Sequence, residues 1–101
     1  MNAQQANHGY EQARNYIVQS DAFCQVSFGY IELTNFPNMN AICVEFHGGS
    51  EYIYVGVPDA LYEALEAVCV EHIETNGAIR VGSFFSRHLF NGFRGYARLN
   101  Q

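Results

Sequence analysis

The clearest pattern of hydrophobic and polar positions runs through residues 42–57, where two stretches of alternating apolar residues flank a short link. The link, residues 47–50, contains two consecutive glycines. Alternation with a period of two is typical of β-strands, and a tight glycine-containing link between two such stretches predicts an antiparallel hairpin. We therefore expect strands over residues 41–47 and 51–57.

The second of these strands has one aromatic face and one aliphatic face. Tyr52 and Tyr54 alternate with Ile53, Val55 and Val57. Because successive side chains of a strand point to opposite faces, the two tyrosines are expected together on one side of the sheet. The aliphatic residues are expected in the core, which leaves the tyrosines on the opposite face.

Further elements precede and follow the hairpin. Alternating residues predict another strand over residues 22–33, and a helix-like spacing of apolar residues predicts a short helix over residues 10–18. A second helix is expected to begin at Pro58, because proline is favoured in the first turn, and to end near Gly77. A third is expected over residues 84–91.

These elements predict one α+β domain: a three-stranded antiparallel sheet followed by two helices, with an added N-terminal helix. We expect residues 1–19 to be an N-terminal helical extension and residues 20–101 to be the main domain. A chain of 101 residues, 49% of them hydrophobic, is long enough for one modest core. No apolar run approaches the ~18–20 residues that a membrane span needs. Since no secretion signal is evident, a cytoplasmic protein without a membrane partner is expected.

Charge is distributed unevenly along the chain. Ten acidic residues and no lysine give a net charge of −5. All ten acids lie within residues 1–74, where Arg14 is the one base, whereas residues 75–101 contain no acid. The bases of this second part are Arg80, Arg87, Arg94 and Arg98. An acidic protein is a poor general nucleic-acid binder, but a local arginine strip can bind an anion. Alternatively, the strip pairs with the acidic part of its own domain or of a second subunit.

The order of the motifs resembles the KTSC domain, a family named for a C-terminal extension of some lysyl-tRNA synthetases that also includes small stand-alone proteins. The matching residues are Gly29-Tyr30, Phe46, Gly48, Tyr52-Ile53-Tyr54, Val57-Pro58, Gly82, Phe84-Phe85 and residues 94–99. The match covers roughly residues 20–99. The first nineteen residues and a longer link at residues 70–81 depart from the family pattern. Since RNA binding has been suggested for this family, the resemblance implies RNA or a nucleotide as the ligand.

The expected function is therefore a non-enzymatic binding module with an aromatic and arginine surface. The candidate ligand-binding residues are Tyr52, Tyr54, Arg87, Phe93, Arg94, Tyr96 and Arg98. Aromatic rings can stack on bases, and guanidinium groups bind phosphate bidentately. The alternative for the tyrosines is packing beneath the N-terminal helix. The alternative for the arginines is pairing with glutamates of the preceding helix, namely Glu63, Glu66 or Glu71.

An acidic protein-binding protein is the competing hypothesis. It would be an inhibitor or adaptor that docks on a basic partner, such as an anti-CRISPR-like protein of a phage or mobile element. The residues expected to face such a partner are Glu45, Glu51, Glu63, Glu66, Glu71 and Glu74. A solvated acidic surface is the simpler interpretation of these residues. The face of Tyr52 and Tyr54 is also a candidate homodimer surface.

Catalysis, metals and cofactors find little support in the sequence. Cys69 and His72 have a spacing that two metal ligands can share, but structural zinc normally needs four ligands and no second pair has a comparable spacing. No nucleophile elbow, zinc-protease motif or phosphate-binding glycine loop is present. We therefore expect neither a metal site nor a cofactor, and we expect no enzymatic activity.

Overall fold

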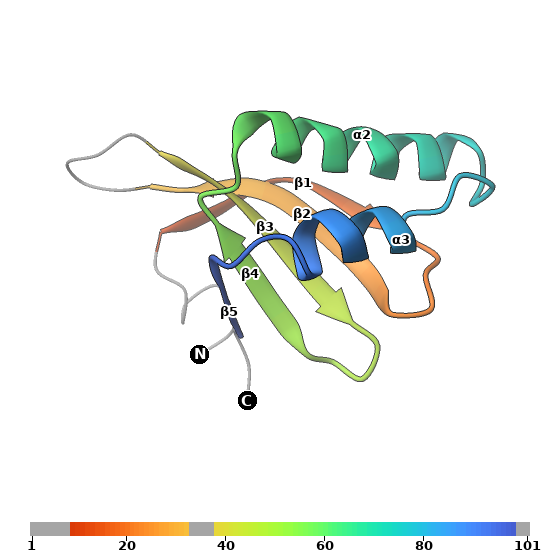
Figure 1. The fold of residues 1–101 in the computed structure, drawn as a ribbon, viewed down its shortest axis with the longest axis horizontal. Helices are drawn as coiled ribbons and strands as arrows, with labels where there is room; N and C mark the ends of the chain where they lie inside the picture. Colours follow the sequence, from red (N-terminus) through yellow and green to blue (C-terminus); the bar gives the residue numbers. More distant parts are fainter. Residues whose placement is uncertain (1–8, 33–37, 99–101) are drawn as a thin grey trace.

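A computed structural model describes residues 9–32 and 38–98. Four long strands and a short fifth form one antiparallel sheet in the order β1-β2-β3-β4-β5, and the helices lie on one of its faces (Figure 1). The strands are β1 (Tyr10–Ile17), β2 (Phe23–Ile31), β3 (Met39–Phe46), β4 (Glu51–Val55) and β5 (Tyr96–Arg98). The helical segments are α2 (Asp59–Glu74), α3 (Gly82–Phe85) and η1 (Ser86–Phe90), a π-helical continuation of α3.

The α+β class, the hairpin and the helix that follows it are confirmed. β3 and β4 are joined by the expected tight link, in which Gly48 and Gly49 both have positive φ. Pro58 caps the start of α2, and the backbone leaves the helix through Asn76 and Gly77, again with positive φ. Glycine adopts this left-handed backbone conformation without the steric cost that a Cβ brings.

The expected N-terminal helix is wrong, because the described part of residues 1–19 contains strand β1 instead. A β-bulge explains the error. The register with β2 shifts between Gln12 and Arg14, which leaves Ala13 without a partner. Tyr10 lies opposite Ile31 and Ile17 opposite Gln25, so Tyr10 and Ile17 share one face although they are seven residues apart. A spacing of seven is typical of a helix face, and a bulged strand reproduces it.

The main core lies between the sheet and the helices. Its fully buried side chains come from β2, β3, α2, α3 and η1, and include Phe28, Ile42, Leu65, Phe85 and Leu89. A smaller buried cluster lies on the opposite face of the sheet and comprises Ile31, Ala41 and Ile53. The sheet is therefore apolar on both faces, but helices cover only one of them (Figure 1).

The expected orientation of β4 is also wrong. Tyr54 pairs with Ile42 and Tyr52 with Val44, so both tyrosines share the helix-covered face, whereas Ile53 lies on the other. Gly56 has a φ of 80° and interrupts the alternation after the strand. Val57 consequently joins Tyr54 in the main core rather than sharing the face of Ile53.

A fifth strand extends the expected three-stranded sheet at its second edge. β5 pairs antiparallel with β4, with Tyr96 opposite Tyr54 and Arg98 opposite Tyr52. The sequence at this point indicates only a short basic and aromatic tail. Within residues 9–32 and 38–98, no helix has the length and apolar character needed to cross a membrane.

Candidate functional site: an arginine edge and a neighbouring cleft

The segment that contains β5 brings aromatic side chains over β4. The ring of Tyr54 lies 6.0 Å from that of Phe90, 6.5 Å from Phe93 and 5.6 Å from Tyr96. Tyr52 lies 5.9 Å from Tyr96. These are ordinary distances for packed aromatic rings. The two tyrosines are thus covered from the C-terminal side of the chain, and not by an N-terminal helix.

This packing divides the expected aromatic residues into buried and accessible ones. Tyr54 is 4% exposed, and burial raises its pKa to about 12. Tyr96 remains 51% exposed, whereas Tyr52 and Phe93 are half-buried. A stacking surface at this edge would therefore consist of Tyr96. Tyr54 packs beside that ring from the neighbouring strand and, because it is buried, cannot itself contact a base or a second copy of the chain.

Two arginines belong to the segment that forms this edge, a third lies on the helical turn before it, and all three are exposed. Arg87 lies on η1, Arg94 precedes β5, and Arg98 is the last residue of β5. Arg98 donates a hydrogen bond from Nη2 to Ser50 Oγ at 3.1 Å. We call Arg87, Phe93, Arg94, Tyr96 and Arg98 the arginine edge.

The glutamates that were considered as partners for these arginines have other positions. Within the described residues, the one ion pair joins Arg14 of β1 to Glu66 of α2. Arg14 binds this carboxylate through two nitrogens, with Nη2 lying 3.0 Å from Oε1. Neither Glu63 nor Glu71 forms an ion pair with the arginine edge in the part of the chain that the structure describes. The alternative of pairing with α2 therefore does not account for Arg87, Arg94 and Arg98.

Glu66 is the centre of a clamp between β1 and α2. Tyr16 OH donates to its Oε2 at 2.8 Å, and Arg14 Nη2 also lies 3.2 Å from Tyr62 OH. Partial burial opposes the charge of Glu66, but the hydrogen bonds from Arg14 and Tyr16 outweigh it and lower the pKa of the carboxyl. Glu66 is thus a structural residue and does not face a partner.

The remaining candidate glutamates lie on different sides of the molecule. Glu45 of β3 lies directly opposite Glu51 of β4 in the strand register, on the sheet face opposite the helices. Burial and the charge of Glu45 raise the pKa of Glu51. Glu63, Glu71 and Glu74 are exposed on α2. The six glutamates consequently do not form one acidic face.

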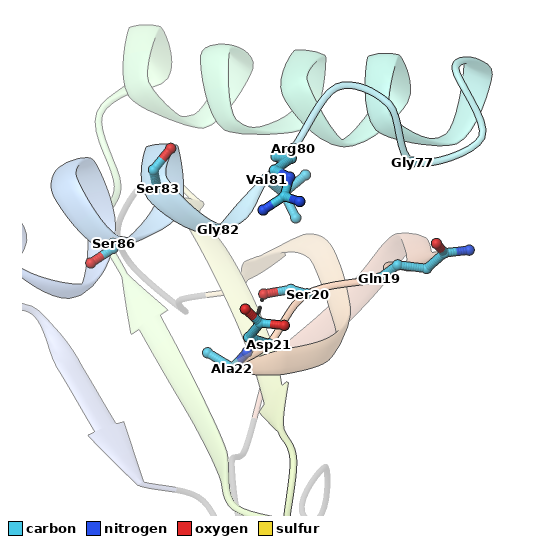
Figure 2. A pocket seen from close by; sticks show the side chains of 10 residues that line it. All are labelled: Gln19, Ser20, Asp21, Ala22, Gly77, Arg80, Val81, Gly82, Ser83 and Ser86. Carbon is cyan, nitrogen blue, oxygen red and sulfur yellow. Dashed lines mark hydrogen bonds between the residues drawn. The ribbon is translucent and has the colours of Figure 1, made fainter.

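A polar cleft of about 780 Å³ lies between two segments that are far apart in the sequence (Figure 2). One wall is the turn between β1 and β2, and the other is the link that runs from the end of α2 into α3 and η1. The lining residues are Gln19, Ser20, Asp21, Ala22, Gly77, Arg80, Val81, Gly82, Ser83 and Ser86. The volume falls within the ~300–1,000 Å³ that is usual for small-molecule sites.

His72 ties the two walls of this cleft together. Its side chain is 2% exposed, Nε2 accepts a hydrogen bond from the backbone N–H of Gln19 at 3.0 Å, and Nδ1 donates to the carbonyl of Ile79 at 2.6 Å. Both ring nitrogens are therefore occupied and neither is available to a metal. Burial raises the pKa of the neighbouring Cys69 thiol to about 12, which keeps it protonated. Among the described residues, no group of three His, Cys, Asp or Glu side chains could hold a metal ion.

Comparison with known proteins adds no relative. No family model matches the chain, and neither a curated protein nor a solved structure matches it. The resemblance to the KTSC domain therefore stays a prediction.

The cleft residues Ser20, Asp21 and Arg80 were not among the predicted site residues. Ser20 and Asp21 follow a strand that the sequence did not reveal, and they meet Arg80 only through the fold. The one signal for Arg80 was its place in the acid-free region of the chain.

Proposed function

We propose that this protein is a binding module that contacts RNA, or a nucleotide, through the arginine edge. The observation that carries the proposal is that Arg87, Arg94 and Arg98 are exposed and form no ion pair among the described residues of a chain with ten acidic side chains. An exposed guanidinium without a carboxylate partner retains its donors for a phosphate.

The composition of the edge agrees with this ligand. Tyr96 presents a half-exposed ring between Arg94 and Arg98, and base stacking on an aromatic ring contributes ~1–3 kcal/mol per base. Arg87 lies on a π-helical turn, a geometry that often occurs at functional sites. The net charge of the rest of the chain is negative, so binding is expected to be local and modest in affinity.

A salt titration tests the proposal directly. Binding of a fluorescein-labelled single-stranded RNA of about 8 nucleotides is followed by anisotropy as the salt concentration rises. Since each phosphate contact contributes ~0.7 to the slope of log K against log salt, Arg87→Gln with Arg94→Gln should reduce that slope by about 1.4. An unchanged slope and affinity would reject the arginine edge as the binding surface.

Arg14→Gln combined with Glu66→Gln provides the matched control. This pair removes an arginine at the far edge of the sheet together with its partner, so no unpaired carboxylate remains. It should leave RNA binding unchanged. A similar loss of binding in this control would show that the effect does not come from the arginine edge.

The acidic surface of α2 supports a second candidate function. Glu63, Glu71 and Glu74 are exposed and lie within one side of the helix, because their spacings of eight and three residues return to a similar angle. This side would dock on a basic protein partner. Exchange of all three for glutamine should abolish a pull-down of such a partner from the native host, and retention of the same partner by the variant would refute the docking surface.

A further inference from the structure

The polar cleft places opposite charges on its two walls. Figure 2 shows Arg80 extending from the link after α2 toward the opposite wall, where Ser20 and Asp21 lie in the turn after β1. Within the described residues, no ion pair joins Arg80 to Asp21 although both line the same cleft. A ligand between the two walls can therefore meet a guanidinium on one side and a carboxylate on the other.

The walls are held in place before any ligand arrives. The imidazole of His72 is hydrogen bonded to Gln19 on one wall and to Ile79 beside the other. Ser20 Oγ accepts a hydrogen bond from the backbone N–H of Ala22 at 3.2 Å, which fixes the turn that carries Asp21. Since the backbone of both walls is already ordered, the entropic cost of binding falls mainly on the exposed side chains of Arg80 and Asp21.

The two charged groups define the ligand by its hydrogen bonds. A guanidinium only donates, and a carboxylate only accepts. The ligand must therefore offer acceptors on one edge and donors on another. Guanine has this arrangement, since O6 and N7 accept while N1–H and the N2 amino group donate. Uracil has a single N–H on its pairing edge, and adenine and cytosine each have a single amino group, so none of the three offers the carboxylate two adjacent donor groups.

We propose that the cleft is a guanine-reading subsite, in which Arg80 donates to O6 and N7 and Asp21 accepts from N1–H and the N2 amino group. This inference rests on the proposed function, because it assigns a base preference to the RNA or nucleotide bound at the arginine edge. One helical segment connects the two places: Ser86 lines the cleft, and the next residue, Arg87, belongs to the arginine edge.

The test compares four nucleotides on the intact protein. Titrations of GMP, AMP, CMP and UMP, followed by the chemical shifts of the backbone amides, should show GMP binding at least ~10-fold more tightly than the other three. The largest shifts should fall on residues of the cleft. Equal affinities, or shifts confined to residues 93–98, would overturn the subsite.

A change of hydrogen-bond polarity sharpens the test. Asp21→Asn replaces two acceptors by one acceptor and one donor, so GMP should lose at least ~10-fold in affinity while xanthosine monophosphate, which has a carbonyl at C2, should gain. Asp21 and Arg80 are both exposed, so Asp21→Asn and Arg80→Gln should leave the thermal unfolding temperature unchanged. An unchanged preference for GMP in both variants would overturn the assignment.

The two proposals fail in different ways. Arg94 does not line the cleft, so Arg94→Gln should leave the preference for GMP unchanged while it weakens RNA binding. If RNA binds with a salt dependence that needs Arg87 and Arg94 but without preference for guanosine, the subsite is refuted and the arginine edge stands. If GMP is preferred while exchange of Arg87 and Arg94 has no effect, the arginine edge is refuted.

Discussion

The two edges of the sheet use arginine in opposite ways. At the β1 edge, Arg14 binds the carboxylate of Glu66 through two nitrogens, and Tyr16 donates to the same carboxylate. At the β5 edge, Arg87, Arg94 and Arg98 form no ion pair among the residues that the structure describes. The same residue type thus stabilises the fold at one edge and remains available at the other. Position in the fold, rather than composition, separates structural arginines from candidate binding ones.

The largest expected effect is a loss of stability at Tyr54, where the β5 edge of the sheet packs on the core. Tyr54→Ala removes a ring that is 4% exposed and supports Phe90, Phe93 and Tyr96, so the free energy of unfolding should fall by ~3–5 kcal/mol, as for other large aromatic residues. Tyr54→Phe keeps the ring and should change stability by less than ~1 kcal/mol. Urea denaturation measures both. Equal losses of unfolding free energy in Tyr54→Ala and Tyr54→Phe would show that the hydroxyl, not the ring, stabilises this edge.

Exchange of the arginines should separate binding from stability. Arg87→Gln with Arg94→Gln should weaken RNA binding about tenfold, which corresponds to ~1.4 kcal/mol, and should leave the unfolding free energy within ~0.5 kcal/mol of the parent. Arg14→Gln should show the reverse, with intact binding and reduced stability. If the exchange at the β5 edge and the exchange of Arg14 both reduced RNA binding, or both reduced stability, the contrast between the two edges would be refuted.

The ion pair of the β1 edge should produce a pH dependence of smaller size. The pKa of Glu66 is lower in the folded protein than its ordinary value of ~4.3, so its charge stabilises the fold above that value. The contribution is lost as the pH falls through the folded pKa. It should amount to about 1 kcal/mol or less, because Arg14 is 47% exposed and solvent screens the pair.

Denaturation of the parent and of Glu66→Gln between pH 7 and pH 3 measures this contribution. The difference in stability between the two proteins should shrink toward acidic pH. A difference that stays constant, or grows, would contradict the role assigned to the Glu66 carboxylate.

Removal of the exposed ring at the second edge should affect stability much less than removal of the buried Tyr54 ring. Tyr96 is 51% exposed, so Tyr96→Ala should cost less than ~1 kcal/mol of unfolding free energy. RNA binding should weaken by ~1–3 kcal/mol if the ring stacks on a base. A variant with normal affinity would restrict the binding surface to the arginines.

Local signals made a large part of this fold predictable. The glycines of the β3–β4 link, the proline at the start of α2 and the alternation within β2, β3 and β4 act over a few residues, and they gave correct elements. Two local irregularities made sequence-based expectations wrong. The bulge at Ala13 gave β1 the spacing of a helix, and Gly56 moved Val57 to the other face of the sheet.

The candidate site was less predictable because distant segments build it. The composition of residues 75–101 was sufficient to indicate the arginine edge. The burial of Tyr54 depends on β5, a strand of three residues with little sequence signal of its own. The cleft is lined by both Asp21 and Arg80, which β2, β3, β4 and α2 separate in the sequence. No local sequence pattern indicates that two residues so far apart in the chain line the same cleft.

The bulge at Ala13 has a further consequence for how the molecule behaves in a crowded solution. Among the strands that the structure describes, β1 is an edge strand of eight residues, and a regular edge strand can pair with another chain through its free N–H and C=O groups. The unpaired residue interrupts the even spacing of those groups and twists the strand locally. A second strand therefore cannot continue the ladder along the full length of β1. The bulge that gives β1 the residue spacing of a helix also protects the folded protein against edge-to-edge aggregation.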